Sequence, residues 1–348
     1  MKTPYIFSLL GGYRALEALR FKQPNELTDA MQPLFSASTE AVKPALLGPE
    51  IVDRVMACPF KASISQQMAL LKAETFVHTP PLVARLSRVF IVGGHLLSGK
   101  SWYVMRRSLP PQSLLFGADM PSFGEAALVN SYQGLHYFGH WLRDDCAVFE
   151  LIEDLPRVSL QRPEWADRRG YEQLFEQHWS EISYGYFEKL HVYRELGVNG
   201  SKRQRFLSLR DRVRRTPPNT SCGVVYLRRA STLDGRTAAN EAELMNTLAA
   251  RGVAIVDSAS GVQSLLTAAL DAEVIITHEG SQAAHALLAL QQHGSLIMLQ
   301  SPYRFYNPHL EWTRLLGMGY GTIVGRATDG GFTISPDEVL QMLDLLKP

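Results

Sequence analysis

The C-terminal half of the chain is predicted to adopt an α/β fold with a doubly wound parallel sheet, and three observations predict it. Short runs of β-branched and other apolar residues alternate there with segments of helical periodicity. Turn residues such as Gly252 separate these segments. Polar and charged side chains follow directly after two of the runs. Strands that alternate with helices form βαβ units, whose strands pair in parallel.

The C-terminal elements are expected to alternate regularly through to the end of the chain. Strands are expected at residues 223–227, 253–256, 274–277, 295–299 and 321–324. Helices are expected at residues 240–250, 262–270, 281–291 and 335–346. The last helix opens with Ser-Pro-Asp-Glu, a pattern typical of a helix N-terminus.

The N-terminal half is less regular, and its first 80 residues are poorly readable. Two β-rich runs around a glycine-rich turn predict a hairpin over residues 89–105. Helices are expected at residues 16–21, 63–73, 136–150 and 171–179, and strands at 127–129 and 157–160. A strongly basic segment at 200–215 has interleaved apolar residues and predicts an amphipathic surface helix.

The chain length favours two domains. At about 150 residues per domain, 348 residues correspond to two. Pro217-Pro218 breaks the basic helix and marks the expected boundary. We therefore expect an N-terminal domain at 1–215, a C-terminal domain at 216–330 and a terminal helix at 331–348.

Composition excludes several classes of protein. The 35 basic and 34 acidic residues nearly cancel, which gives no bulk electrostatic reason to expect nucleic acid as a partner. The three cysteines, Cys58, Cys146 and Cys222, are far apart and fit a reducing compartment. The apolar runs are shorter than the roughly 20 residues that span a bilayer, and the N-terminal run is too short for a signal peptide. A cytoplasmic location is expected.

Residues 94–101 match the phosphate-loop pattern Gly-x4-Gly-Lys-Ser. In that reading the backbone amides would cradle phosphates, Lys100 would contact the terminal phosphates and Ser101 would bind magnesium. A phosphate loop must open a helix, whereas β-forming residues follow Ser101 and Pro110-Pro111 come soon after. The sequence favours a hairpin turn, and a P-loop ATPase or kinase remains the alternative function.

Two further patterns each allow a functional interpretation, a metal site for the first and a nucleic-acid site for the second. His136, His140 and Asp144 would share one face of a helix, where a metal ion or a single working histidine are both open readings. No Asp-x-Asp pattern, the usual metal motif of sugar-nucleotide enzymes, occurs in the chain. The basic segment 200–215 is more typical of a solvated helix face than of a nucleic-acid site.

Charged and polar residues gather where a doubly wound sheet places its ligands, beyond the carboxyl ends of its strands. One set follows strand 223–227 and comprises Arg228, Arg229, Arg236, Asn240 and Glu241. A second set follows strand 274–277 and comprises His278, Glu279, Gly280, Ser281 and Gln282. Guanidinium groups and a helix N-terminus that converge on one place predict a phosphate or diphosphate site. The alternative is that residues of the first set only cap a helix, since Asn240 would be an ordinary N-cap.

These residues resemble glycosyltransferase family 61. The central pattern is Tyr-Leu-Arg-Arg at 226–229, Arg236, Asn-Glu at 240–241, Glu-Leu at 243–244 and the Gly252 turn. Upstream, Gly-His-Trp-Leu at 139–142 with Asp145 resembles the family's His-Trp motif, and Glu-Gly-Ser at 279–281 resembles its His-Gly-Ala loop. The resemblance covers about residues 85–325. Glu279 departs from the family's histidine before the glycine, and His285 departs from its frequent asparagine.

The resemblance implies an inverting hexosyl- or pentosyltransferase of GT-B architecture, with two Rossmann-like domains that face a cleft. It implies that the C-terminal domain binds a nucleotide sugar, expected to be UDP-linked, and that the N-terminal domain binds a glycan or lipid-linked saccharide acceptor. Arg228 and Arg236 are expected on the diphosphate, without a metal ion or other cofactor. His140 is the first candidate for the general base, and Asp145 or Asp144 is the second.

The function expected from this resemblance is polysaccharide biosynthesis by a cytoplasmic enzyme. A peripheral contact of residues 200–215 with the inner membrane is left open, since basic segments bind anionic headgroups. A third reading is a binding protein that keeps the fold of the transferases and lacks catalysis.

Overall fold

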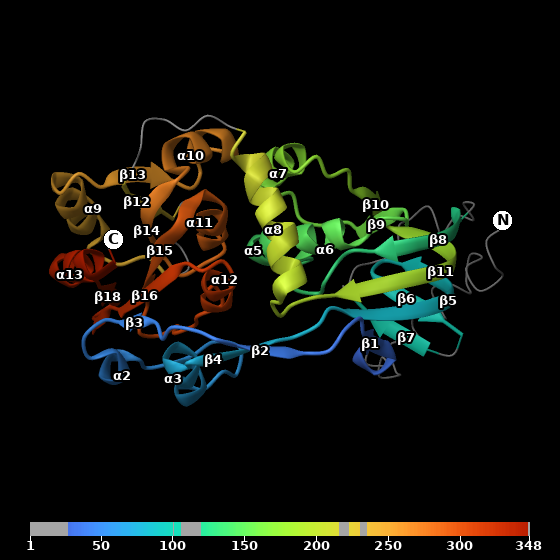
Figure 1. Ribbon diagram of the computed structural model, residues 1–348, viewed down its shortest axis with the longest axis horizontal. Helices are drawn as coiled ribbons and strands as arrows, with labels where there is room; N and C mark the ends of the chain where they lie inside the picture. The colour runs from blue at the N-terminus through green and yellow to red at the C-terminus, as the bar shows by residue number, and fades with distance from the viewer. Residues whose placement is uncertain (1–26, 100, 106–119, 216–222, 230–234, 347–348) are drawn as a thin grey trace. The chain divides into compact units, whose positions relative to one another are not determined.

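The structure, a computed structural model, describes residues 27–99, 101–105, 120–215, 223–229 and 235–346 (Figure 1). The chain divides into two compact units. Unit 1 comprises Met1–Ser36, Pro80–Glu164 and Glu176–Gly197, and unit 2 comprises Ala37–Thr79, Trp165–Phe175 and Val198–Pro348. The division differs from the expected boundary near residue 215, because three separate stretches of the chain build unit 2.

Unit 1 is built on one mixed sheet of eight strands. The strand order is β10-β9-β8-β11-β5-β6-β7, with β1 paired to β5. The strands are β1 (Met31–Pro33), β5 (Leu82–Val92), β6 (His95–Ser98), β7 (Ser101–Val104), β8 (Ser122–Leu128), β9 (Arg157–Leu160), β10 (Ser180–Ile182) and β11 (Tyr184–Arg194). The β10-β9-β8-β11 half is parallel, and every other pairing is antiparallel. Unit 1 therefore has a parallel half-sheet extended by an antiparallel meander.

The expected hairpin at 89–105 is a three-stranded meander. An additional strand, β6, pairs with β5 on one side and with β7 on the other. Gly93 and Gly94 make the first turn with positive φ angles of 55° and 80°, which glycine adopts without strain. Ser98 pairs with Ser101 across the second turn. Lys100 lies outside the described residues, but Ser101 opens a strand where a phosphate loop needs a helix, so the P-loop reading is wrong.

The helix expected at 136–150 is present as three consecutive pieces. They are α5 (Phe138–His140), a π-helical turn η3 (Trp141–Asp145) and α6 (Cys146–Leu151). All five residues of the π-helical turn are buried. Such turns are rare and lie frequently at functional sites.

Unit 2 contains the predicted parallel sheet, in the order β13-β12-β14-β15-β16-β3. The strands are β12 (Val224–Arg228), β13 (Ala254–Asp257), β14 (Ala272–His278), β15 (Leu290–Gln300), β16 (Gly319–Val324) and β3 (Leu46–Leu47). All five pairings are parallel. The strand order reverses between β12 and β14, which is the place where doubly wound sheets bind ligands.

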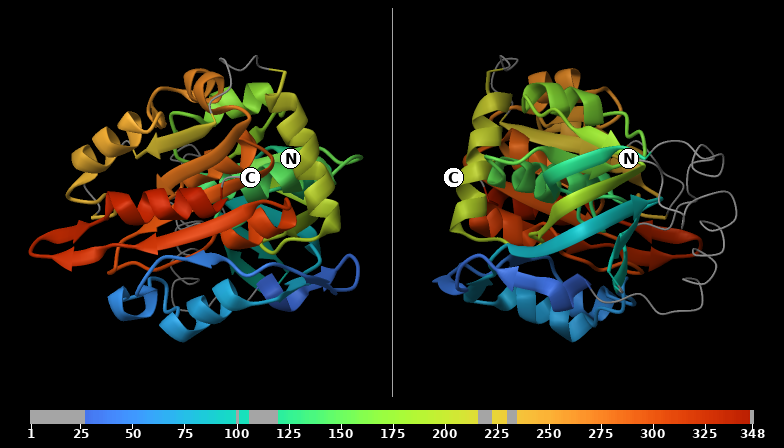
Figure 2. Two further views of the ribbon diagram at one scale, coloured as in Figure 1. Left: turned by 60° about the vertical axis from the view of Figure 1, so that its left-hand side comes forward. Right: turned by 90° about the vertical axis from the view of Figure 1, so that its right-hand side faces the viewer.

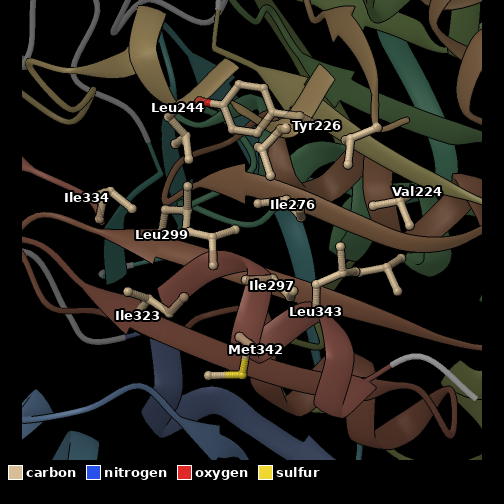
Figure 3. Close-up of a cluster of buried hydrophobic side chains, with 14 of the residues drawn as sticks. Val224, Tyr226, Leu244, Ile276, Ile297, Leu299, Ile323, Ile334, Met342 and Leu343 are labelled. Carbon is tan, nitrogen blue, oxygen red and sulfur yellow. The ribbon is translucent and has the colours of Figure 1, made fainter. Parts of the chain in front are cut away.

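Helices cover both faces of this sheet (Figure 1). One face packs against α9 (Glu241–Ala250) and α13 (Pro336–Leu346), and the other is covered by α10 (Val262–Ala269), α11 (Ala283–Ala289) and α12 (Leu310–Leu315). Figure 3 shows the core of the first face, where Leu244 of α9 and Met342 of α13 meet strand residues such as Ile276 and Ile297. The predicted C-terminal strands and helices are thus confirmed, with α11 shorter than expected because β15 already begins at Leu290.

An N-terminal segment completes unit 2 and was not predicted to do so. It carries β2 (Ser38–Ala41), β3, α2 (Ile51–Arg54), α3 (Ile64–Lys72) and β4 (Thr75–His78). Helix α3 confirms the helix expected at 63–73, and its Ser63 and Gln66 form a reciprocal capping box. In both views of Figure 2 this segment, in blue, lies along the edge of the sheet that β16 and β3 form. Asn307 donates from its backbone and side chain to Gln67 Oε1, at 2.9 and 3.2 Å, which ties α3 to the loop after β15.

The basic helix expected at 200–215 is α8 (Gly200–Val213), but the prediction of a solvated face is wrong for Lys202 and Arg210, which are buried. Arg210 is buried and donates to the carbonyl oxygen of Leu287, and Arg214 donates to Leu288 O at 3.1 Å. The ammonium of Lys202 lies 4.7 Å from the centre of the Trp312 ring and is fully buried. Arg210 and Arg214 satisfy backbone carbonyls at the end of α11, and Lys202 faces the Trp312 ring, so these three cations are not available to a membrane or to nucleic acid.

The remaining elements are η2 (Leu27–Ala30), α7 (Arg168–Leu174) and the hairpin β17 (Arg326–Thr328) and β18 (Gly331–Thr333). Helix α7 begins and ends earlier than the helix expected at 171–179, and the helix expected at 16–21 lies outside the described residues. Among the described helices, none has the length and apolarity that a bilayer crossing requires.

Candidate functional site

The candidate catalytic residues lie at the π-helical turn of unit 1. His140 Nδ1 lies 2.8 Å from Asp144 Oδ2. The His140 side chain is 25% exposed, whereas that of Asp144 is 1% exposed. Arg143 donates from Nε to the same Asp144 oxygen at 3.2 Å. A buried carboxylate held by arginine therefore fixes the orientation of a partly exposed imidazole, an arrangement that suits a histidine for proton transfer.

Asp145 has a different environment. Its Oδ1 accepts hydrogen bonds from the backbone and hydroxyl of Ser131, at 3.1 and 2.7 Å. Its Oδ2 has no hydrogen-bond partner, and a Cβ on Gly134 would lie 2.0 Å from it. Burial raises the pKa of Asp145 to about 7 despite the Ser131 hydrogen bonds and the charge of Arg162. The hydrogen bonds from Ser131 indicate a structural role for Asp145, which holds the turn at residues 131–134.

The raised pKa of Asp145 predicts a pH-dependent stability. The fold favours the protonated carboxyl, so Asp145 contributes stability that is fully present below pH of about 4 and is lost as the pH rises to about 7. The shift corresponds to a loss on the order of 4 kcal/mol. Asp145→Asn removes this titration, so we expect the variant to match the wild type near pH 4 and to be more stable near pH 7. Urea unfolding from pH 4 to 8 checks this.

The control for this prediction is Asp154→Asn, which changes an exposed aspartate of the same unit. Asp154→Asn keeps Asp145, so this variant should lose stability between pH 4 and 7 as the wild type does. A pH-independent difference between Asp145→Asn and the wild type would show that the buried carboxyl does not titrate in this range.

The structure gives no support for a metal ion bound by His136, His140 and Asp144. His136 is exposed, and its Nδ1 lies 2.7 Å from the Tyr132 carbonyl oxygen, whereas His140 faces Asp144. Within the described part of the chain, no group of three or more His, Cys, Asp or Glu side chains is placed to hold a metal ion.

Of the first set of predicted donor-site residues, Arg228 and Glu241 lie together at the carboxyl end of β12. Arg228 Nη1 donates to Asp257 Oδ2 at 3.2 Å, and its Nε lies 3.5 Å from Glu241 Oε2. Glu241 is buried and also accepts a hydrogen bond from the Tyr226 hydroxyl at 2.9 Å. Glu241 thus supports the arginine, and the Arg228 side chain remains 39% exposed.

Asn240 does not act as the expected side-chain N-cap of α9. Its side-chain amide forms reciprocal hydrogen bonds with the backbone of Ile334, donating to the carbonyl at 2.9 Å and accepting from the N–H at 3.0 Å. Asn240 therefore joins the start of α9 to the chain that precedes α13.

Glu279 of the second set lies directly after β14, where Arg236 of the first set and Arg304 contact it. Glu279 Oε2 accepts a hydrogen bond from Arg304 Nε at 3.1 Å and lies 3.6 Å from Arg236 Nη1. The Glu279 side chain is 6% exposed, while those of Arg236 and Arg304 are 25% and 28% exposed. Two arginines thus converge on one buried carboxylate at the edge where the sheet's ligands are expected.

The loop after Glu279 is packed against Arg229. Arg229 Nη1 donates to Gln282 Oε1 at 2.9 Å, and Gln282 Nε2 donates to His278 O at 2.7 Å. A Cβ on Gly280 would lie 2.0 Å from Arg229 Nη1, so only glycine allows the guanidinium to approach this closely. Gly280 and Ser281 precede Gln282, the N-cap of α11, and α11 has seven residues.

The His278 side chain lies in the core and makes no hydrogen bond to the arginines of this loop. Its ring is fully buried between Tyr226 and Phe332, at centroid distances of 6.3 and 6.1 Å. Neither ring nitrogen has a hydrogen-bond partner, and burial together with the charge of Arg229 lowers its pKa to about 3. His278 is therefore neutral at physiological pH, and its geometry gives it a packing role.

Sequence reasoning missed Arg304. It follows the carboxyl end of β15, so the rule that singled out the residues after β12 and β14 would also have found it. The His285 side chain, another departure from the family pattern, lies 2.7 Å from the Tyr171 hydroxyl of α7 and is buried.

The glycosyltransferase 61 family model matches residues 138–297. Residues 138–297 belong to glycosyltransferase family 61. The matched range begins just before His140 and includes every predicted donor-site residue of unit 2, whereas Arg304 and the segment 37–79 lie outside it. Membership implies glycosyltransferase activity in general. No curated protein gives a significant match to the chain.

Proposed function

We propose that the protein is an inverting glycosyltransferase that moves a sugar from a nucleotide sugar to a glycan or lipid-linked saccharide. The observation that carries this proposal is the group of arginines at the carboxyl edge of the unit 2 sheet. Arg228, Arg236 and Arg304 are all partly exposed there, and each is paired with a carboxylate. The family 61 match supports the reaction class.

The arginines are suited to a diphosphate leaving group. Charge develops on the leaving oxygen as the bond to the sugar breaks, and preorganised cations stabilise that charge. Guanidinium groups bind phosphate oxygens through paired N–H donors. In the proposed complex, Arg236 and Arg304 donate to the diphosphate, and Arg304 Nε keeps its hydrogen bond to Glu279. Arg228 and the backbone amides of Gly280 and Ser281 are the further donors of this proposal.

His140 is the proposed general base. The acceptor hydroxyl attacks the anomeric carbon, the bond from that carbon to the diphosphate oxygen breaks, and the hydroxyl proton passes to His140 Nε2. Asp144 holds the other ring nitrogen at 2.8 Å and so sets the orientation of the imidazole. Displacement in a single step inverts the anomeric configuration.

Nucleotide binding is the first test of the proposal. Melting temperatures are measured with UDP, GDP, CMP and ATP, each with magnesium and with EDTA. A ligand at a hundredfold excess over its Kd adds about 2.7 kcal/mol of stability. Stabilisation by UDP that EDTA leaves unchanged would support a metal-independent, UDP-linked donor. Stabilisation by none of the nucleotides would contradict the proposal.

Arg236→Ala is expected to weaken UDP binding by about 10- to 100-fold, because charge-assisted hydrogen bonds contribute about 1.5–3 kcal/mol. The melting temperature without ligand should change little, since Arg304 remains on Glu279. Isothermal titration with UDP measures the effect. Arg251→Ala is the matched control, because Arg251 is an exposed arginine of the same unit beyond the end of α9. If both variants bind UDP with the same affinity, Arg236 does not contact the donor.

A further inference from the structure

Phe60 is an exposed aromatic residue that has no role in the transfer reaction proposed above. It is 60% exposed and lies in the loop between α2 and α3. Its φ angle is 58° and that of Lys61 is 61°, so two consecutive residues with side chains adopt the left-handed region. Such backbone conformations cost on the order of 1–3 kcal/mol each and persist where surrounding contacts enforce them.

The surrounding contacts hold this loop against the one that follows β15. Met56 and Ala57 both donate from their backbone N–H groups to Pro302 O, at 2.8 and 3.1 Å. Phe305 N donates in turn to Ala57 O at 2.9 Å. The loop that carries Phe60 is thereby fixed to the carboxyl edge of the sheet, the same edge that carries Glu279.

Arg304 joins Phe60 to the arginine group. Its guanidinium carbon lies 5.1 Å from the centre of the Phe60 ring, while its Nε donates to Glu279 Oε2 at 3.1 Å. Tyr306 contacts the Phe60 ring edge-on, with 5.5 Å between centroids. An exposed, braced aromatic ring therefore lies one side chain away from the proposed diphosphate site.

This juxtaposition matches the layout of a nucleoside diphosphate, in which a ribose separates a diphosphate from a planar base. We propose that Phe60 is the stacking platform for the nucleobase of the donor. The inference rests on the proposed function, because it requires that the arginines hold the diphosphate. Stacking on an aromatic ring tolerates different bases, so Phe60 supplies affinity for a base in general, with Arg304 held between the ring and Glu279.

The test compares UDP and GDP with inorganic diphosphate, which has no base. Phe60→Ala is expected to weaken binding of UDP or GDP by about 5- to 100-fold and to leave binding of inorganic diphosphate unchanged. Phe60→Trp should keep the nucleotide affinity, and Phe60→Leu should lose it. Met56→Ala is the matched control, because Met56 belongs to the same loop and is also 60% exposed. Titration calorimetry on the full chain measures all four variants.

The outcomes separate this inference from the proposed function. If wild-type protein binds UDP or GDP and Phe60→Ala binds it equally well, the platform is wrong and the transferase proposal stands. If Phe60→Ala weakens nucleotide and inorganic diphosphate equally, Phe60 acts only by bracing Arg304, and the platform is again wrong. If wild-type protein binds neither nucleotide, both proposals fail.

Discussion

Replacing His140 with alanine is expected to lower kcat for sugar transfer by about 10²- to 10⁴-fold, the usual range for the loss of a general base. The affinity for the nucleotide should persist, because every proposed donor ligand belongs to unit 2. Turnover is measured as release of UDP from the UDP-sugar donor, and binding is measured by titration with UDP. This separation of binding from turnover is the signature expected of a base.

Two further variants, at Asp144 and His136, make the test more specific. Asp144→Asn keeps the size of the residue that orients His140 but removes its charge, so we expect a smaller loss of kcat and a changed pH profile. His136→Ala removes an exposed histidine four residues earlier, whose Nδ1 contacts the Tyr132 carbonyl oxygen, and it should retain activity. Full activity of His140→Ala would exclude His140 as the base, and an inactive His136→Ala would point to damage of the whole segment.

The C-terminal sheet could be predicted because its signals are local. Each strand is a short apolar run, each helix has its own periodicity, and Gly252 adopts the positive φ of 78° that a helix end favours. The residues beyond β12 and β14 then follow from a rule about strand ends. The grouping of Arg236 with Glu279 was predictable for this reason.

The missed features depend on contacts between distant parts of the chain. Strand β3 has two residues and α2 has four, too few for any periodicity, and their place in unit 2 depends on partners far along the sequence. The cations of α8 give the pattern of a solvated face, and only the position of Leu287 and its neighbours shows that Arg210 is buried. His278 likewise looked like a ligand because its position in the sequence does not show on which face of β14 its ring lies.

Arg54 of α2 lies in the N-terminal segment 37–79 of unit 2, and its replacement has the largest expected effect on stability in that segment. Its two terminal nitrogens donate to the two carboxylate oxygens of Glu338 at 2.6 and 2.7 Å, and Nη1 also donates to Val324 O at 3.0 Å. Arg54 is 9% exposed, and the hydrogen bonds with Glu338 hold its pKa above its usual range. Arg54→Ala leaves the Glu338 carboxylate and a backbone carbonyl without this partner. We expect a loss of about 3–5 kcal/mol, the range for breaking a buried ion pair, measured by urea unfolding of the full chain.

Arg326 is the matched control for this prediction, since its guanidinium contacts Glu338 at 3.7 Å and also Glu50 at 2.8 Å, which lies 3.1 Å from Arg54 Nη2. It is 58% exposed, and exposed ion pairs contribute about 1 kcal/mol or less, so Arg326→Ala should change the free energy of unfolding little. The double variant Arg54→Met with Glu338→Leu removes both charges of the ion pair and should recover much of the loss. If Arg54→Ala and Arg326→Ala lower the free energy of unfolding equally, the ion pair of Arg54 with Glu338 does not hold the N-terminal segment on unit 2. A large difference that the double variant removes would show that the cost arises from the unpaired carboxylate.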